Sequence, residues 1–214
     1  MEFQGFPKIS RLSRECIITE KIDGTNAQIY IEPVPDPYIP EKGIYSDCGM
    51  IMRVGSRTRF LTLEDDNHGF CNWAFEHGIE LIMGLGPGRH YGEWWGKGIQ
   101  RNYGLKTKKF SLFNVIRWCL PWEIPKQIPK EDPRIIKMQD VLPKCCGLVP
   151  VLWRGIFNTN EVDISLDMLK KYGSKAAPGF MKPEGVVVYH IPGNVGFKKT
   201  IEKDEEPKSK KEKS

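Results

Sequence analysis

One tetrapeptide near the amino terminus carries residue types that could perform covalent chemistry. In the stretch TEKIDGTNAQIYI, Lys21 lies two residues before Asp23, and Gly24 follows directly. A lysine amine is a nucleophile only when neutral, so nearby positive charge must lower its pKa from the free value of about 10.4. The alternative is structural, because Asp-Gly between apolar runs is also typical of a solvated hairpin turn in which both residues tolerate positive φ.

A second basic element could supply that positive charge. The stretch GFKK places Lys198 and Lys199 on a predicted strand that could cross beside Lys21. Lysines that share a small site discourage each other's protonation and bind phosphates. Adjacent strand residues point to opposite faces, so only one of the two is expected to enter the site, and we favour Lys198.

The elements around these residues predict a mixed α+β fold rich in antiparallel strands and hairpins. Apolar residues alternate with polar ones over residues 26–31, which is typical of a half-buried strand. Strand–turn–strand units are predicted over residues 16–32 and 183–202. The other predicted elements are strands within 49–63, 108–118 and 148–157, helices over 66–85 (broken near Gly78) and 161–173 (ending at a glycine), and Pro-rich surface segments at 33–43 and 121–133.

The composition is that of a globular protein with a mild basic excess. The 214 residues are 40% hydrophobic and 28% charged, and the formal net charge is +5. No apolar run approaches the roughly 20 residues that cross a bilayer, and the first residues lack a secretory pattern. The six cysteines form no C-x-x-C pair and the four histidines no metal spacing, so we expect reduced thiols, no zinc site and a cytoplasmic location, in the host cell if the source is viral.

Five further motifs follow the tetrapeptide in a fixed order: GSRTRF (55–60), YGEWWG (91–96), FSLFNV (110–115), PEGVVV (183–188) and GFKK (196–199). This set resembles the covalent nucleotidyltransferase superfamily of polynucleotide ligases and mRNA capping enzymes. EKIDGTN and GEWWGKGIQRNYG are most similar to its phage-type ATP-dependent RNA ligases. The resemblance covers residues 18–202 and implies an ATP-grasp-like nucleotidyltransferase core of antiparallel sheets flanked by helices. Only a dozen residues follow, nine of them charged, so we expect no C-terminal OB barrel, an adenylyltransferase domain over 1–202 and a disordered tail over 203–214.

The resemblance also implies roles for the matching residues. Lys21 attacks the α-phosphate of ATP, and Glu184 ligates Mg²⁺ or Mn²⁺ with help from Asp23 through water. The implied nucleotide contacts are Glu20 (adenine edge, through its backbone), Arg57 (ribose and nucleic-acid end), Tyr91 (stacking on adenine), Glu93 (ribose hydroxyls), and Lys198 with Lys199 (phosphates). The structural alternatives are a strand-end surface acid for Glu184, core packing for Tyr91 and a solvated loop charge for Arg57.

The last motif departs from the K-x-K pattern of many ligases. Either Lys198 is the second lysine and Gly196 replaces the first, or Lys198 is the first and Thr200 replaces the second. This leaves the number of phosphate-binding lysines open. Separately, basic residues are interleaved with aromatic residues in one stretch that contains Lys97, Arg101, Lys106, Lys108 and Lys109. This pattern is typical of surfaces that track a nucleic-acid backbone, and it also occurs in solvated loops.

These observations predict an ATP-dependent RNA ligase that joins 5′-phosphate and 3′-hydroxyl ends through lysyl-AMP and adenylylated RNA. The expected cofactors are ATP and either Mg²⁺ or Mn²⁺, and the expected partner is RNA. We also expect a monomer without membrane contact. A minimal DNA ligase and a GTP-dependent capping guanylyltransferase are the alternative enzymes. A nucleic-acid-binding module with an inactive nucleotide pocket is the alternative from another class.

Overall fold

The computed structural model describes residues 9–37, 41–118 and 142–202, together with Phe3, Gly5, Phe6 and Asp204. The chain divides into two compact units, Met1–Ile22 with Pro150–Ser214, and Asp23–Val149. Each unit contains one sheet in which antiparallel pairing dominates, and helices accompany both sheets. This confirms the predicted mixed α+β class. Within the described residues, no helix combines the length and apolar character needed to cross a membrane.

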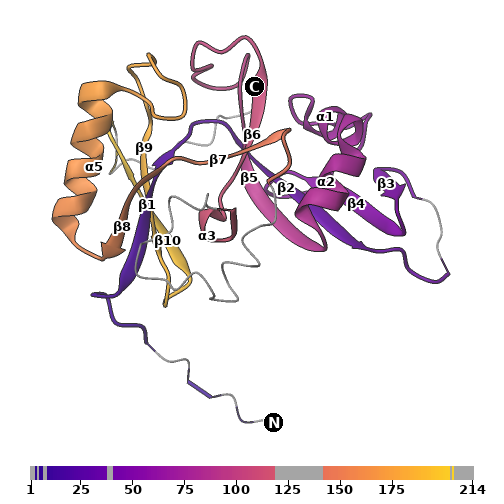
Figure 1. Ribbon diagram of the computed structural model, residues 1–214, viewed down its shortest axis with the longest axis horizontal. Helices are drawn as coiled ribbons and strands as arrows, with labels where there is room; N and C mark the ends of the chain where they lie inside the picture. The colour runs from indigo at the N-terminus through magenta and orange to yellow at the C-terminus, as the bar shows by residue number, and fades with distance from the viewer. Residues whose placement is uncertain are drawn as a thin grey trace, which may run out of the picture. The chain divides into compact units, whose positions relative to one another are not determined.

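The first unit has a four-stranded antiparallel sheet in the order β10-β9-β1-β8. Its strands are β1 (Glu15–Lys21), β8 (Val151–Ile156), β9 (Gly185–His190) and β10 (Val195–Thr200). Helix α5 (Thr159–Tyr172) runs along this sheet in Figure 1 and buries Val162, Leu166 and Leu169 against Cys16, Ile18, Val186 and Val188. The helix begins where the Asn158 side chain accepts from the backbone N–H of Asn160, and it ends at Gly173, as predicted.

The second unit has a six-stranded sheet in the order β3-β4-β2-β5-β6-β7, antiparallel except for the β6–β7 pair. Its elements are β2 (Thr25–Pro33), β3 (Ile44–Asp47), β4 (Met50–Gly55), α1 (Phe70–Glu76), α2 (Gly78–Leu85), β5 (Gly88–Gly96), β6 (Lys108–Leu112), α3 (Val115–Trp118) and β7 (Cys146–Leu148). One face of the sheet is apolar and packs with α1 and α2 around Phe70, Trp94 and Phe110. The other face of β2 and β5 is therefore left for polar side chains.

Several predicted boundaries differ from those observed. The first helix starts at Phe70 instead of residue 66, and it breaks at His77, next to Gly78 as predicted. The strand predicted over 108–118 ends at Leu112, and α3 follows. The strand predicted over 148–157 is two strands in different sheets, because Pro150 has no N–H to continue a ladder. The Pro-rich segment 121–133, residues 38–40 and all but Asp204 of the tail 203–214 lie outside the described residues.

The chain between β1 and β2 does not form a hairpin. β1 pairs with β8 and β9, whereas β2 pairs with β4 and β5, so the two consecutive strands belong to different sheets. The K-x-D-G tetrapeptide therefore connects one sheet to another, and the hairpin interpretation is wrong.

Candidate active site

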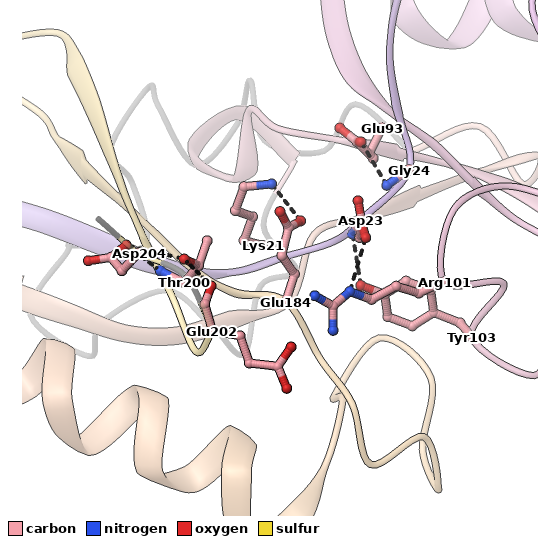
Figure 2. A network of polar contacts seen from close by, with 10 residues as sticks. All are labelled: Lys21, Asp23, Gly24, Glu93, Arg101, Tyr103, Glu184, Thr200, Glu202 and Asp204. Carbon is pink, nitrogen blue, oxygen red and sulfur yellow. Dashed lines mark hydrogen bonds and ion pairs between the residues drawn. The ribbon is translucent and has the colours of Figure 1, made fainter. Parts of the chain in front are cut away.

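Lys21, the predicted nucleophile, is the last residue of β1 and forms an ion pair with Glu184. Its Nζ donates to Glu184 Oε2 at 2.6 Å (Figure 2). Glu184 directly precedes β9, whose first residue, Gly185, is the register partner of Lys21. The Glu184 side chain is only 3% exposed, and that of Lys21 is 21% exposed. The end of the first sheet thus brings the predicted nucleophile and the predicted metal ligand together.

Gly185 is required by the close approach of two strands at this point. A β-carbon at position 185 would collide with the backbone carbonyl oxygen of Lys199 on β10. The expectation that Gly185 permits a close backbone approach is confirmed.

The register of β10 separates the two candidate phosphate-binding lysines. Lys198 lies opposite Val187, which lies opposite Thr19 on β1. Directly opposed residues of antiparallel strands share a face, and so do residues two apart on one strand. Lys198 therefore lies on the same sheet face as Lys21, and its side chain is exposed.

Lys199 lies on the opposite face, the one that α5 covers. It pairs in register with Val186, which is part of the apolar cluster under α5. Its Nζ donates to Asp163 of α5 at 2.7 Å, and this hydrogen bond raises the pKa of Lys199 above its usual value. Strand alternation thus directs Lys199 away from Lys21, which differs from its predicted place among the nucleotide contacts.

Thr200 lies at the position where a K-x-K pattern starting at Lys198 would place the second lysine. It shares the face of Lys21, since both are register partners of Gly185. Its hydroxyl donates to the Glu202 carbonyl at 2.9 Å, and its backbone N–H donates to Asp204 at 2.8 Å (Figure 2). Thr200 thus stabilises the turn that follows β10, and on this face β10 carries Lys198 as its single lysine.

The Glu20 side chain is committed to the loop that follows α5. It is 1% exposed, and its carboxylate accepts from the Ser174 hydroxyl at 2.5 Å and from the backbone N–H groups of Lys175 (2.8 Å) and Ala176 (2.9 Å). Burial raises the pKa of Glu20 above its ordinary value, although the three hydrogen bonds oppose the shift. Any contact of Glu20 with a nucleotide is left to its backbone, as the resemblance implied.

In the second unit, Asp23 is held by two residues of the loop after β5. Its Oδ2 accepts from Arg101 Nε at 3.0 Å, and its backbone N–H donates to the Tyr103 hydroxyl at 2.8 Å (Figure 2). Tyr103 is buried and packs edge-on against Trp95. Arg101, which belongs to the basic stretch predicted to track a nucleic-acid backbone, is an ion-pair partner of Asp23.

Gly24 is needed for packing and not for a turn. A β-carbon there would lie 2.5 Å from the Trp94 carbonyl oxygen and 2.7 Å from Trp95 Cβ, so β5 leaves no room for a side chain. The φ angle of Gly24 is not positive, which differs from the turn geometry inferred from Asp-Gly. Its N–H donates to Glu93 Oε1 at 3.0 Å, and this bond ties the motif to the predicted ribose ligand.

Tyr91 and Glu93 lie on the polar face of the second sheet. They alternate on β5 with His90, Gly92 and Trp94, and Trp94 is in the core. Tyr91 is 53% exposed, which excludes core packing and leaves its ring available for stacking. Glu93 is 8% exposed and keeps its side chain beside the start of β2.

Two polar residues on this face were not identified from the sequence. Asn26 is the register partner of Glu93, and Gln28 is the register partner of Tyr91. The alternation over residues 26–31 was the signal that places both on the face of Tyr91. The residues that hold Asp23 and Glu20 come from distant segments, and no sequence signal links them.

The basic residues predicted to form one surface do not all lie on the same face of the second sheet. Lys109 lies on the face of Trp95, with its Nζ 5.8 Å from the ring centroid, and is exposed. Lys108 points to the other face, where its Nζ donates to the His68 carbonyl at 2.6 Å. Lys97 and Lys106 are exposed. Arg57 is exposed in the loop after β4, as expected for a residue that contacts a ligand end or solvent.

The second unit also contains a cluster of His77, Glu80 and Cys145, whose potential ligand atoms all lie within 4.8 Å of one another. The sequence spacing predicts no metal site here.

Comparison with known proteins supports this fold and identifies a family. No curated protein sequence matches the chain. Solved structures of a Naegleria gruberi RNA ligase have a similar fold. An apo variant gives a TM-score of 0.54 at 20% identity, one with AMP and Mn gives 0.53 at 19%, and one with ATP and Mn gives 0.53 at 17%; each match covers 88% of this chain and 50% of that chain. The chain thus spans about half the length of the Naegleria ligase. A family model described as RNA ligase matches residues 14–203, and the chain therefore belongs to the RNA ligase family.

Proposed function

We propose that this chain is an ATP-dependent RNA ligase that seals 5′-phosphate and 3′-hydroxyl ends through lysyl-AMP and adenylylated RNA. The observation that carries the proposal is the 2.6 Å pair of Lys21 and Glu184 on a sheet face that also presents Lys198. The amine of Lys21, the carboxylate of Glu184 and the ammonium of Lys198, our candidate for binding phosphate, thus belong to one compact unit. Membership in the RNA ligase family supports the assignment, and the solved relatives with ATP or AMP and Mn support the nucleotide and the metal.

In the first step the Lys21 amine forms a P–N bond with the α-phosphorus of ATP, and the bond to the β,γ-pyrophosphate breaks. An amine attacks only when neutral, so Lys21, whose side chain is 21% exposed, first releases to water the proton with which it donates to Glu184. A second proton leaves the nitrogen to water as the P–N bond forms. Lys198 binds phosphate oxygens from the same face and attracts the negative charge of the leaving pyrophosphate.

The residues present suit Mg²⁺ or Mn²⁺, which prefer carboxylate oxygens. Glu184 is a buried carboxylate beside the nucleophile, and Asp23 is a second carboxylate in the same motif. When bound, the cation neutralises phosphate oxygens and lowers their repulsion toward the nucleophile. When no cation is bound, Lys21 compensates the negative charge of the buried Glu184 carboxylate, and Arg101 compensates that of Asp23.

The polar face of the second unit supplies candidates for the nucleoside. The exposed ring of Tyr91 is suited to stack on adenine, and the Glu93 carboxylate accepts hydrogen bonds from ribose hydroxyls. Arg57 is suited to contact the ribose or the RNA end. Within this proposal residues 1–202 form the adenylyltransferase domain with an ATP-grasp-like core, and the enzyme acts as a monomer in the cytoplasm.

The remaining steps transfer AMP from Lys21 to the 5′-phosphate and then release AMP as the 3′-hydroxyl attacks. Pyrophosphate is the leaving group of the first step, and in the last step the 3′-hydroxyl loses its proton to water as AMP leaves. Lys109, on the Trp95 face, is a candidate for contact with the RNA backbone.

The test is covalent labelling with ATP or GTP, each with Mg²⁺ or Mn²⁺, read by intact mass and on a denaturing gel. We expect an acid-labile adduct of one AMP with ATP and none with GTP. Lys21→Ala should abolish the adduct, whereas Lys199→Ala, a lysine of the opposite face, should retain it. An adduct that persists in Lys21→Ala would refute the assignment, and labelling by GTP would favour a guanylyltransferase. Sealing of nicked RNA compared with nicked DNA separates RNA ligase from DNA ligase, and absence of any adduct would favour a binding module.

A further inference from the structure

Three side chains with metal-ligating atoms meet in the second unit, on elements that the proposed ligase chemistry does not use. His77 and Glu80 lie at the start of α2, three residues apart, and Cys145 directly precedes β7. One potential ligand atom from each lies within 4.8 Å of the other two. All three residues are partly exposed, so an ion would have access from solvent.

Glu80 organises the cluster. Its Oε1 accepts from the backbone N–H of Cys145 at 2.9 Å, which fixes the cysteine beside α2. Its Oε2 lies 3.7 Å from His77 Nδ1. The His77 ring packs near Trp73, with centroids 5.3 Å apart. The ligand atoms are therefore oriented by contacts that do not depend on an ion.

The chemistry of the three donors selects the kind of ion. A thiolate and an imidazole are soft or borderline ligands that suit Zn²⁺, whereas Mg²⁺ and Ca²⁺ prefer oxygen. Zinc binds sulfur at about 2.3 Å and nitrogen or oxygen at about 2.0–2.2 Å, so its ligand atoms lie closer together than 4.8 Å. Small rotations of these side chains would bring the three ligand atoms to zinc-binding distances, and a water molecule would fill the fourth position.

We propose that His77, Glu80 and Cys145 bind one Zn²⁺ ion that ties α2 to the start of β7. The site joins segments 65 residues apart, which is why sequence spacing does not predict it. An ion there cross-links the helix to the strand and stabilises the second unit by binding only to the folded chain.

The experiment uses the full chain, first freed of metal with a chelator. Co²⁺ is added as a spectroscopic probe, because a cobalt–thiolate bond gives a near-ultraviolet charge-transfer band, and Zn²⁺ is then added in competition. The variants are Cys145→Ser and His77→Ala. Cys48→Ser is the matched control, since Cys48 is an exposed thiol whose Sγ lies 3.2 Å from Asp47 Oδ1 and which, among the residues that the structure describes, belongs to no such cluster.

We expect one equivalent of Co²⁺, a thiolate band that Zn²⁺ abolishes, and a melting temperature that rises with Zn²⁺. Cys145→Ser should lose the band, His77→Ala should bind Zn²⁺ at least tenfold more weakly, and Cys48→Ser should behave as the parent chain. If Cys145→Ser does not fold, His77→Ala, which changes a partly exposed ring, decides the question. A band that survives in Cys145→Ser, a loss of the band in Cys48→Ser, or unchanged Zn²⁺ affinity in His77→Ala would overturn the proposal.

Discussion

Lys198 and Lys199 are neighbours in the sequence but lie on opposite faces of β10. Lys198 shares the face of Lys21, whereas Lys199 donates to Asp163 of α5 at 2.7 Å. The pairing of β10 with β9, and of β9 with β1, decides which of the two lysines shares the sheet face of Lys21. Register therefore puts Lys198, and not Lys199, on the sheet face of Lys21.

Lys198→Ala should reduce the rate of lysyl-AMP formation by about 10- to 100-fold, because a hydrogen bond to a charged phosphate contributes about 1.5–3 kcal/mol. Lys199→Ala should change it less than about threefold, since it removes only an exposed ion pair. The measurement is the single-turnover adenylation rate at saturating ATP. Equal losses in the two variants would contradict the face assignment.

Glu184→Ala and Glu184→Gln should both lose adenylation by at least about 100-fold, because each removes the negative charge beside Lys21 and the predicted metal ligand. Asp163→Ala is the matched control, because it removes the carboxylate partner of the lysine on the other face. Adduct formation is followed by intact mass over a Mn²⁺ titration. Near-parental activity of Glu184→Gln would show that the negative charge at position 184 is not needed for adenylation.

Lys109→Ala should weaken RNA binding and sealing while leaving lysyl-AMP formation nearly unchanged. Loss of one phosphate contact should lower the slope of log affinity against log salt by about 0.7–0.9. Lys108→Ala is the comparison, because the Lys108 ammonium is bound to the His68 carbonyl on the opposite face. Binding is measured at several salt concentrations with one nicked RNA, and identical slopes for both variants would remove Lys109 from the RNA surface.

Glu20→Ala should lower the free energy of unfolding by about 2–4 kcal/mol, since it leaves buried donors of the 174–176 loop without an acceptor. Glu20→Gln should be close to the parent chain at neutral pH. The amide oxygen can accept from Lys175 and Ala176, and the amide nitrogen can donate to the Ser174 hydroxyl. Urea denaturation measures both effects, and a large loss in Glu20→Gln would show that the charge itself is needed.

The same pair of variants tests the raised pKa of Glu20. The folded chain binds the Glu20 proton more tightly than the unfolded chain, in which the pKa of Glu20 is near 4.5. The Glu20 contribution to the free energy of unfolding should therefore fall as pH rises from about 4.5 through the higher folded pKa. Glu20→Gln should lack this fall, so the stability difference between parent and variant should change over that window. A difference independent of pH would contradict the raised pKa.

The sequence by itself determined the fold class, most of the elements and the family resemblance. Alternation over residues 26–31 and the glycine after α5 are local signals, and local signals can be read without knowing which strands pair. The ordered motifs from Lys21 to Lys198 also lie in the sequence, so the candidate site residues could be named in advance.

Only the tertiary structure decided which partners these residues contact and on which sheet face they lie. The Asp-Gly step connects strands of two different sheets. The backbone of Trp94, which lies on a strand distant in sequence, leaves no room for a side chain at position 24. Arg101 pairs with Asp23, a contact that the basic stretch around Arg101 does not predict. Strand order, register and the partners of buried charges depend on contacts between segments far apart in the chain, and the local pattern of residues does not encode them.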